Sequence, residues 1–114
     1  MSVRDCFKNG VVQLLLLKLL SESDLYGYEI AQLIKERSGG LIEMPQGTMY
    51  PTLYKLQDNG YISDKKVQVG KRMTRIYYHL EPMGKEYLQV IEGDFDLFYT
   101  GIQRIIKYTE EKDI

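Results

Sequence analysis

The sequence predicts a mainly α-helical protein with one β-hairpin, organised as a winged helix-turn-helix plus a long C-terminal helix. Apolar residues recur at helical spacing in four segments of the 114-residue chain. Between the third and fourth segments the apolar period changes from about 3.6 to 2, which is typical of strands. The order helix, helix, helix, hairpin is that of a winged helix-turn-helix. We expect this domain over residues 1–80 and the C-terminal helix, which serves dimerisation, over residues 81–114.

The first predicted helix lies within residues 11–20 and is apolar on nearly all sides. Val12, Leu15, Leu16 and Leu19 share one face at i, i+3, i+4 and i+7. A helix that is apolar nearly all round is buried nearly all round. In a domain this small, we therefore expect a partner chain to cover part of this helix.

A second helix is predicted over residues 25–37, after a polar cluster at residues 21–24 that offers capping side chains. Gly39 and Gly40 end it, because glycine adopts the left-handed C-terminal conformation without steric cost.

The third helix is predicted to begin near Gly47 or Thr48 and to end at residues 59–60. Pro51 fixes this start, because proline is tolerated only near the beginning of a helix. Three apolar residues at i, i+4 and i+7 are expected to face inward: Met49, Leu53 and Leu56.

Residues 61–69 and 74–80 alternate in polarity and predict two paired strands with a tip at residues 70–72. The inner face of the second strand is expected to carry Ile76, Tyr78 and Leu80. The other face is expected to carry Arg75, Tyr77 and His79.

Pro82 suits the first turn of the last helix, which we expect to continue to about residue 108. Such a helix is about 40 Å long at 1.5 Å per residue, so a domain of this size cannot cover its whole apolar stripe. The stripe therefore predicts a second chain. It consists of Tyr87, Ile91, Phe95, Phe98, Ile102 and Ile105.

Charge is unevenly distributed along the chain. Residues 1–80 carry eleven Lys and Arg against eight Asp and Glu, a net charge of +3, whereas residues 81–114 carry four against eight, a net charge of −4. Any anionic partner is therefore expected to bind the first part. The overall net charge of −1 argues against a histone-like or polybasic protein.

The start of the third helix and the hairpin together indicate nucleic-acid binding. In a helix-turn-helix, the first residues of the later helix meet base edges in the major groove. The candidate contacts there are Gln46, Thr48, Met49, Tyr50, Thr52 and Lys55. Between Lys65 and Arg75 the hairpin carries five positive charges and no acid, which suits phosphate or minor-groove contact. These charges belong to Lys65, Lys66, Lys71, Arg72 and Arg75.

Each set also has a plainer interpretation. The polar residues of the third helix could form an ordinary exposed face, and Tyr50 could pack in the core with its hydroxyl satisfied. Basic residues on a hairpin also protect its edge from aggregation. The adjacency of the two sets favours DNA binding.

Four motifs carry a family resemblance. They are Tyr26-Gly27-Tyr28-Glu29-Ile30, the run from Gly47 to Leu56, Asn59-Gly60-Tyr61-Ile62, and Tyr77-Tyr78-His79-Leu80. In this order and spacing, over about residues 11–85, they resemble the PadR family of bacterial transcriptional regulators. The single C-terminal helix resembles the short subfamily. The chain departs from the family pattern in having no Trp, and in Glu81, where Thr is common and would be a better N-cap.

The resemblance implies a homodimeric repressor whose two recognition helices enter successive major grooves of double-stranded DNA. Because these grooves lie about 34 Å apart, the operator should be an inverted repeat. The resemblance also implies release by a small hydrophobic or aromatic effector, although a Trp-lined drug site does not transfer to this chain. Candidates for the dimer interface and a possible effector pocket are Val12, Leu15, Leu16, Ile91, Phe95, Phe98, Tyr99 and Ile102. A stripe of this kind is more commonly dimer core than ligand pocket.

The alternative is a winged-helix module that binds another protein and has no effector. The modest charge of +3 favours it slightly, because DNA-binding domains are usually strongly basic. The salt dependence of binding separates the two, because release of counterions from phosphates makes DNA binding salt-sensitive.

Nothing in the sequence supports an enzyme, a cofactor or a metal site. Cys6 and His79 are the only residues of their kinds, which excludes an intrachain disulfide and His-rich metal sites. The acidic group at residues 92–96 lies on different sides of a helix and has no basic or histidine partner nearby. The apolar run at residues 11–20 is shorter than the roughly 20 residues of a membrane span, so we expect a cytoplasmic protein without a membrane partner.

Overall fold

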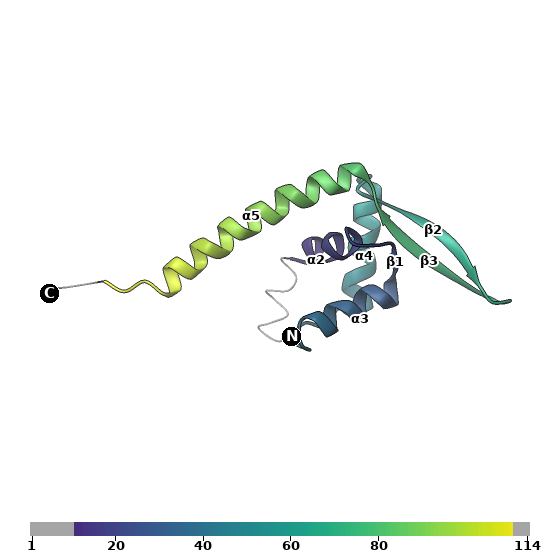
Figure 1. Cartoon of the computed structure of the whole chain (residues 1–114), viewed down its shortest axis with the longest axis horizontal. Coiled ribbons are helices and arrows are strands. Elements are labelled where there is room, and N and C mark those ends of the chain that lie inside the picture. Colours follow the sequence, from purple (N-terminus) through teal and green to yellow (C-terminus); the bar gives the residue numbers. More distant parts are fainter. Residues whose placement is uncertain (1–10, 111–114) are drawn as a thin grey trace.

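The computed structural model describes residues 11–110, so Cys6 lies outside the described residues. This part of the chain forms four helices and a three-stranded sheet (Figure 1). The helices are α2 (Val12–Leu20), α3 (Gly27–Arg37), α4 (Gln46–Asp58) and α5 (Pro82–Ile106). The strands are β1 (Leu25–Tyr26), β2 (Ile62–Val69) and β3 (Met73–Leu80).

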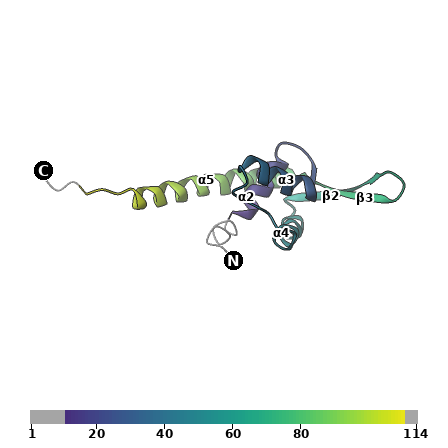
Figure 2. The same cartoon turned by 90° about the horizontal axis from the view of Figure 1, so that it is seen from below.

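The arrangement confirms the predicted winged helix-turn-helix followed by a long helix. In Figure 1, α5 and the β2–β3 hairpin extend in opposite directions from the group formed by α2, α3 and α4. Figure 2 shows that α4 projects from one edge of this group, with the hairpin reaching out beside it. The expected division at residues 80/81 stays a prediction.

The boundaries of α4 and α5 lie close to those predicted. The helix α4 begins at Gln46, with Pro51 in its second turn, and is capped at its C-terminus by Asn59. The helix α5 has Pro82 in its first turn and ends at Ile106, two residues earlier than expected. Glu81, which was expected to be a poor N-cap, makes no capping hydrogen bond through its side chain.

The strand β1 corrects the predicted start of the second helix. Leu25 and Tyr26 do not begin α3 but pair with Tyr78 and Tyr77 at the free edge of β3, which gives the strand order β1-β3-β2. Tyr26 is extended, and its backbone N–H donates to the carboxylate of Glu29 at 3.2 Å. Because this bond satisfies a donor at the helix end, α3 begins at Gly27.

The core is built by α2, α3, α4, the sheet and the first part of α5. Its largest side chains with less than 2% exposure are Tyr78, Leu16, Leu17, Ile30, Met49, Leu53 and Leu56. Gly39 and Gly40, with φ of 65° and 83°, end α3 as predicted, in the left-handed conformation that glycine adopts readily.

The structure corrects two of the candidate interface residues. Val12 and Leu16 are 5% and 0% exposed in the single chain, because α2 packs against α3, α4, α5 and β3. A side chain covered by its own chain cannot also contact a partner, so both predictions are wrong. Leu15 is half-buried and stays a candidate.

The prediction that the inner face of β3 is buried is confirmed for Tyr78 and Leu80, which are 2% and 8% exposed. It is wrong for Ile76, which is 39% exposed. Ile76 lies one residue beyond the part of β3 that pairs with β1, on the side toward the hairpin tip, and its side chain is not covered by the core.

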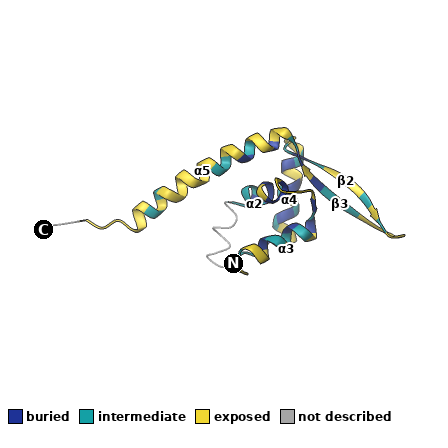
Figure 3. Cartoon of the chain, viewed as in Figure 1, coloured by how far each residue is buried: buried dark blue, intermediate teal, exposed yellow. Residues whose placement is uncertain are grey.

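The two halves of α5 differ in burial (Figure 3). Gly84 and Leu88 in its first half are buried. In its second half the apolar side chains Leu97, Phe98 and Ile105 are 75%, 71% and 79% exposed. Among residues 11–110, no helix combines the length and apolar composition needed to cross a membrane.

Candidate nucleic-acid interface

The exposed part of α4 carries polar side chains at its beginning and middle. Gln46 and Lys55 are exposed, and Thr48 and Thr52 are half-buried. The hydroxyl of Thr52 donates to the carbonyl oxygen of Thr48 at 2.9 Å. Its proton is therefore used inside the helix, and the hydroxyl is left to act as an acceptor toward a base or another donor.

Met49 corrects the predicted set of DNA contacts. Its side chain is 1% exposed and lies in the core with Leu53 and Leu56. The inward spacing of these three residues was part of the prediction, and a side chain that fills the core cannot reach a base edge.

Tyr50 is anchored between the two helices of the helix-turn-helix. It is half-buried, and its hydroxyl lies so close to Gly27 that a Cβ at this position would collide with it. Gly27 therefore allows α3 and α4 to approach closely. The ring of Tyr50 lies 6.2 Å from that of Tyr54, which is 55% exposed. The position of Tyr50 favours packing and leaves Tyr54 as the more accessible phenol.

The hairpin presents its cations in two different environments. Lys65, Lys66, Lys71 and Arg72 are exposed along the strands and at the tip. Arg75 is half-buried, and its guanidinium lies 4.5 Å from the centre of the Tyr26 ring, a cation–π contact. Arg75 is thus held against β1, whereas the other four side chains, Lys65, Lys66, Lys71 and Arg72, are exposed and can reach a polyanion.

A polar cluster, not predicted from the sequence, joins the strands at the base of the hairpin. His79 Nδ1 lies 2.7 Å from a carboxylate oxygen of Asp24, and its Nε2 lies 3.9 Å from Glu81. The Ser63 hydroxyl donates to the same oxygen of Glu81 at 2.7 Å. The hydrogen bond to Asp24 is the main reason that the pKa of His79 is raised above its usual value. Asp24 and His79 are 55 positions apart, so no local sequence signal predicts this contact.

Tyr78 lies in the core, on the inner face of the sheet. Burial raises the pKa of its phenol to about 12, with smaller contributions from Tyr54, Tyr50 and Asp64. The phenol therefore stays neutral at physiological pH and acts as part of the core.

An open groove of about 480 Å³ runs between α4 and β2. Its lining residues are Tyr54, Gln57, Asp58, Ile62, Ser63 and Asp64. None of the candidate effector residues lines this groove. Within residues 11–110, no three His, Cys, Asp or Glu side chains are arranged to hold a metal ion.

The remaining interface candidates follow α5 outward. Ile91 is half-buried against the core of its own chain. Phe95 and Ile102 are 38% and 37% exposed, and Phe98 and Tyr99 are 71% and 53% exposed. The rings of Phe95 and Tyr99 stack with centres 6.0 Å apart. The outer stripe, which we define as Phe95, Phe98, Tyr99, Ile102 and Ile105, is an exposed apolar surface of the kind that marks an interaction site.

Comparison with protein families gives a match to the transcriptional regulator PadR-like family over residues 16–90. An uncharacterized protein X of Lysinibacillus sphaericus is 29% identical over 108 residues, which cover 89% of this chain and 99% of the relative. The negative transcriptional regulator PadR of Bacillus subtilis is 32% identical over 78 residues, which cover 68% of this chain but 43% of the relative. The chain thus matches less than half the length of that regulator.

Solved structures agree with the family match. A transcriptional regulator from Clostridium thermocellum is 31% identical with a TM-score of 0.83, over 89% of this chain and 98% of that one. Bacillus subtilis PadR in complex with operator DNA is 26% identical with a TM-score of 0.65, over 91% of this chain and 52% of that one.

Proposed function

Because this chain belongs to the PadR-like family of transcriptional regulators, we propose that it binds an inverted-repeat operator in double-stranded DNA as a homodimer and represses transcription. In this proposal the first turns of α4 enter the major groove, with Gln46, Thr48, Thr52 and Lys55 toward the bases and phosphates. Tyr50 is kept as a candidate for a phosphate contact through its hydroxyl.

The observation that carries the proposal is the exposed cationic hairpin beside the exposed polar face of α4. Lys65, Lys66, Lys71 and Arg72 project from a hairpin that has no acid between residues 65 and 75. Such a surface attracts phosphates and places the reading helix against the duplex. In this proposal Arg75 contacts the phosphate backbone of the DNA while its guanidinium remains stacked on Tyr26. The operator complex of the Bacillus subtilis relative supports DNA as the partner.

The outer stripe of α5 supports the homodimer. Its apolar side chains lack cover from their own chain, and the stripe matches itself when two copies pair about a two-fold axis. In the dimer the stripe of one copy lies against that of the partner, with Leu15 at the margin. Pairing through α5 fixes the two recognition helices at one separation, which is what an inverted repeat requires.

Repression and effector release complete the proposal. The relative in Bacillus subtilis is a negative regulator, which favours repression here. The stacked rings of Phe95 and Tyr99 offer a planar apolar surface for a small aromatic effector at the dimer interface. An effector acts only by its difference in affinity for the two arrangements of the dimer. Phe95→Ala should therefore reduce release by an aromatic compound by a larger factor than it reduces operator binding, which also depends on this residue through the outer stripe.

The proposal is tested by fluorescence anisotropy with duplex DNA from upstream of the protein's own gene, at about 50 mM and 200 mM salt. We expect affinity to fall by about a thousandfold between them, since a dimer contacting six or more phosphates releases that many counterions. The variant K71A/R72A should bind more weakly and reduce the salt slope by about 4 per dimer, one unit for each lost phosphate contact.

The matched control is K85A/K107A, which removes the same charge from the first turns and the C-cap of α5, away from the hairpin tip. It should leave the affinity nearly unchanged. Equal weakening by both pairs would indicate a non-specific charge effect. Binding that does not depend on salt would contradict phosphate contact and favour the protein-binding module.

A further inference from the structure

The helix α5 is attached to the rest of the chain through its first half alone. Gly84 and Leu88 are buried, Tyr87 and Glu92 are half-buried, and beyond Glu92 the apolar side chains from Phe95 to Ile106 are exposed. In Figure 1 the second half of α5 extends away from the helices. The contacts of residues 84–92 therefore determine the direction in which α5 leaves the domain.

Tyr87 makes two of these contacts, to different elements. Its ring stacks on the ring of Tyr61 with centres 4.3 Å apart and planes 7° from parallel. Its hydroxyl donates to Oε1 of Gln13 in α2 at 2.7 Å. One side chain thus joins α5 to both α2 and the segment that contains Tyr61.

Tyr61 connects the recognition helix to the hairpin. It follows the end of α4 and directly precedes β2, and its backbone N–H donates to the carbonyl oxygen of Leu56 in α4 at 3.0 Å. Its own carbonyl oxygen accepts from the backbone N–H of Glu81 at 3.0 Å. The position of Tyr61 is therefore coupled to the positions of α4 and the hairpin, the two elements proposed to bind DNA.

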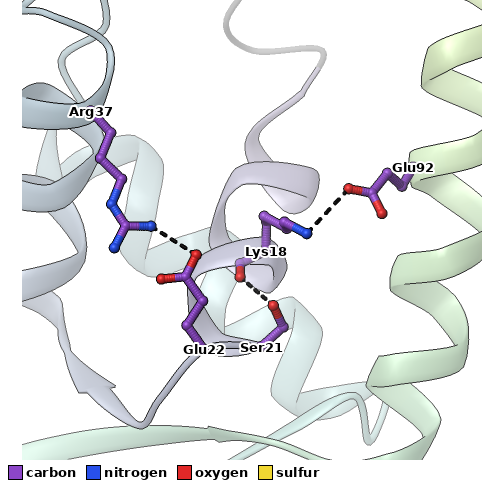
Figure 4. A network of polar contacts seen from close by, with 5 residues as sticks. All are labelled: Lys18, Ser21, Glu22, Arg37 and Glu92. Carbon is purple, nitrogen blue, oxygen red and sulfur yellow. Dashed lines mark hydrogen bonds and ion pairs between the residues drawn. The ribbon is translucent and has the colours of Figure 1, made fainter.

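Two further features define where α5 rests. A Cβ at Gly84 would collide with the carbonyl group of Tyr61, so the first turn of α5 fits closely against this segment. One and a half turns after Tyr87, Glu92 pairs with Lys18 of α2 at 3.6 Å (Figure 4). This ion pair is half-exposed and therefore weak, which leaves Tyr87 as the principal polar and aromatic link.

The length of α5 amplifies any change at this attachment. From Glu92 to Ile106 the helix extends about 21 Å at 1.5 Å per residue. A rotation of about 10° at the attachment displaces its far end by about 4 Å. One base pair step along DNA is about 3.4 Å, so a small rotation corresponds to about one base pair of half-site separation.

We propose that Tyr87 is a positioning residue that sets the half-site spacing of the operator, by fixing the direction of α5 relative to α4 and the hairpin. The inference rests on the proposed dimeric operator binding. It assigns Tyr87 no contact with DNA and no contact with the partner copy.

The experiment measures the affinity for a series of duplexes that differ only in half-site spacing. The half-site is first selected by the wild-type protein from a randomised duplex pool, and is then built into inverted repeats with the selected spacing and with one or two base pairs more or fewer. The wild type should prefer one spacing by about tenfold or more over its neighbours. Tyr87→Ala should reduce this preference to about threefold or less, because α5 is then held less firmly.

Two further variants separate the contacts of Tyr87 and remain informative if Tyr87→Ala fails to fold. Tyr87→Phe keeps the ring stack but loses the bond to Gln13, and Gln13→Ala loses the same bond from the other side. Both should flatten the spacing profile less than Tyr87→Ala and to the same extent as each other. The control Ile34→Val removes a methylene from the core at α3 and should lower stability while leaving the spacing profile intact.

The outcomes distinguish the inference from the proposed function. The positioning role alone would be overturned if the wild type selects a half-site and prefers one spacing, and the Tyr87 variants keep the same preference. Their overall affinity could then still be lower. A wild type that selects no sequence would overturn the proposed function and this inference with it.

Discussion

The helix α2 and the outer half of α5 have the same kind of sequence and opposite environments. Both carry apolar residues at helical spacing, yet Leu16 in α2 is 0% exposed while Phe98 in α5 is 71% exposed. The difference arises from length and position, since α2 lies among three helices and a strand while α5 extends past them. Helical periodicity indicates that a face is covered but does not tell which chain covers it.

The residues of α2 therefore stabilise the fold of the single chain, whereas the outer stripe of α5 is proposed to stabilise the association of two chains. The residues around Leu16 stabilise the fold of a single chain, because their burial is complete without a partner. In the proposed dimer, the outer stripe of α5 gains the same apolar burial from the second copy. Substitutions in the two regions should thus separate folding from association.

The largest effect is expected at Leu16. Leu16→Ala leaves a cavity in the core and should lower the free energy of unfolding by about 2–5 kcal/mol. Urea denaturation followed by circular dichroism measures this change, and the loss should appear at every protein concentration. A loss below about 1 kcal/mol would mean that α2 is not part of the core of the single chain.

The next largest effect is expected at Phe98. Phe98→Glu places a charge in the outer stripe and should convert the dimer to a monomer, lowering operator affinity by about a hundredfold because the two half-sites are no longer linked. Sedimentation equilibrium measures the mass and anisotropy measures the affinity. Thr100→Glu, on another side of the same helix, should change neither. A monomeric wild type would contradict the interface.

Gly84 tests the junction between the two regions. Gly84→Ala should destabilise the chain by about 1–3 kcal/mol, because the added Cβ meets a backbone carbonyl that cannot rotate away. Gly93→Ala is the matched control, since a Cβ there meets open space and should stabilise α5 by up to about 1 kcal/mol. Thermal denaturation of both variants should give shifts of opposite sign.

The smallest effect is expected at His79. Because its folded-state pKa is raised, the stabilisation by its pair with Asp24 is fully present below the unfolded pKa of 6.5 and is lost as the pH rises through the folded-state value. The melting temperature of the wild type should therefore fall slightly relative to His79→Gln as the pH goes from 5.5 to 8.5. The effect is small because both side chains are more than half exposed. A difference that grows with pH would contradict the pairing.

Much of the fold follows from patterns within single segments. Pro51 and Pro82 mark helix starts, Gly39 and Gly40 end α3, and a change of period marks the hairpin. The strand β1 does not follow, because a two-residue strand is too short for a period and forms only when β3 is beside it.

The candidate site was predictable only where its residues lie within one segment of the sequence. The exposed cations of the hairpin stand in one run of sequence, whereas the Asp24–His79 pair and the Tyr87–Gln13 bond join residues 55 and 74 positions apart. Met49 is instructive because its spacing with Leu53 and Leu56 already indicated the core. Its inclusion among the DNA contacts conflicted with that pattern. The side chain is 1% exposed and therefore belongs to the core.

The most direct test of dimeric operator binding is the mass of protein on one duplex. Multi-angle light scattering of the purified complex with a duplex carrying one inverted repeat should give two chains per duplex, twice the 13.3 kDa of the single chain. Two chains per duplex is the stoichiometry that one recognition helix on each half-site requires. One chain per duplex, at concentrations that saturate the DNA, would contradict the account.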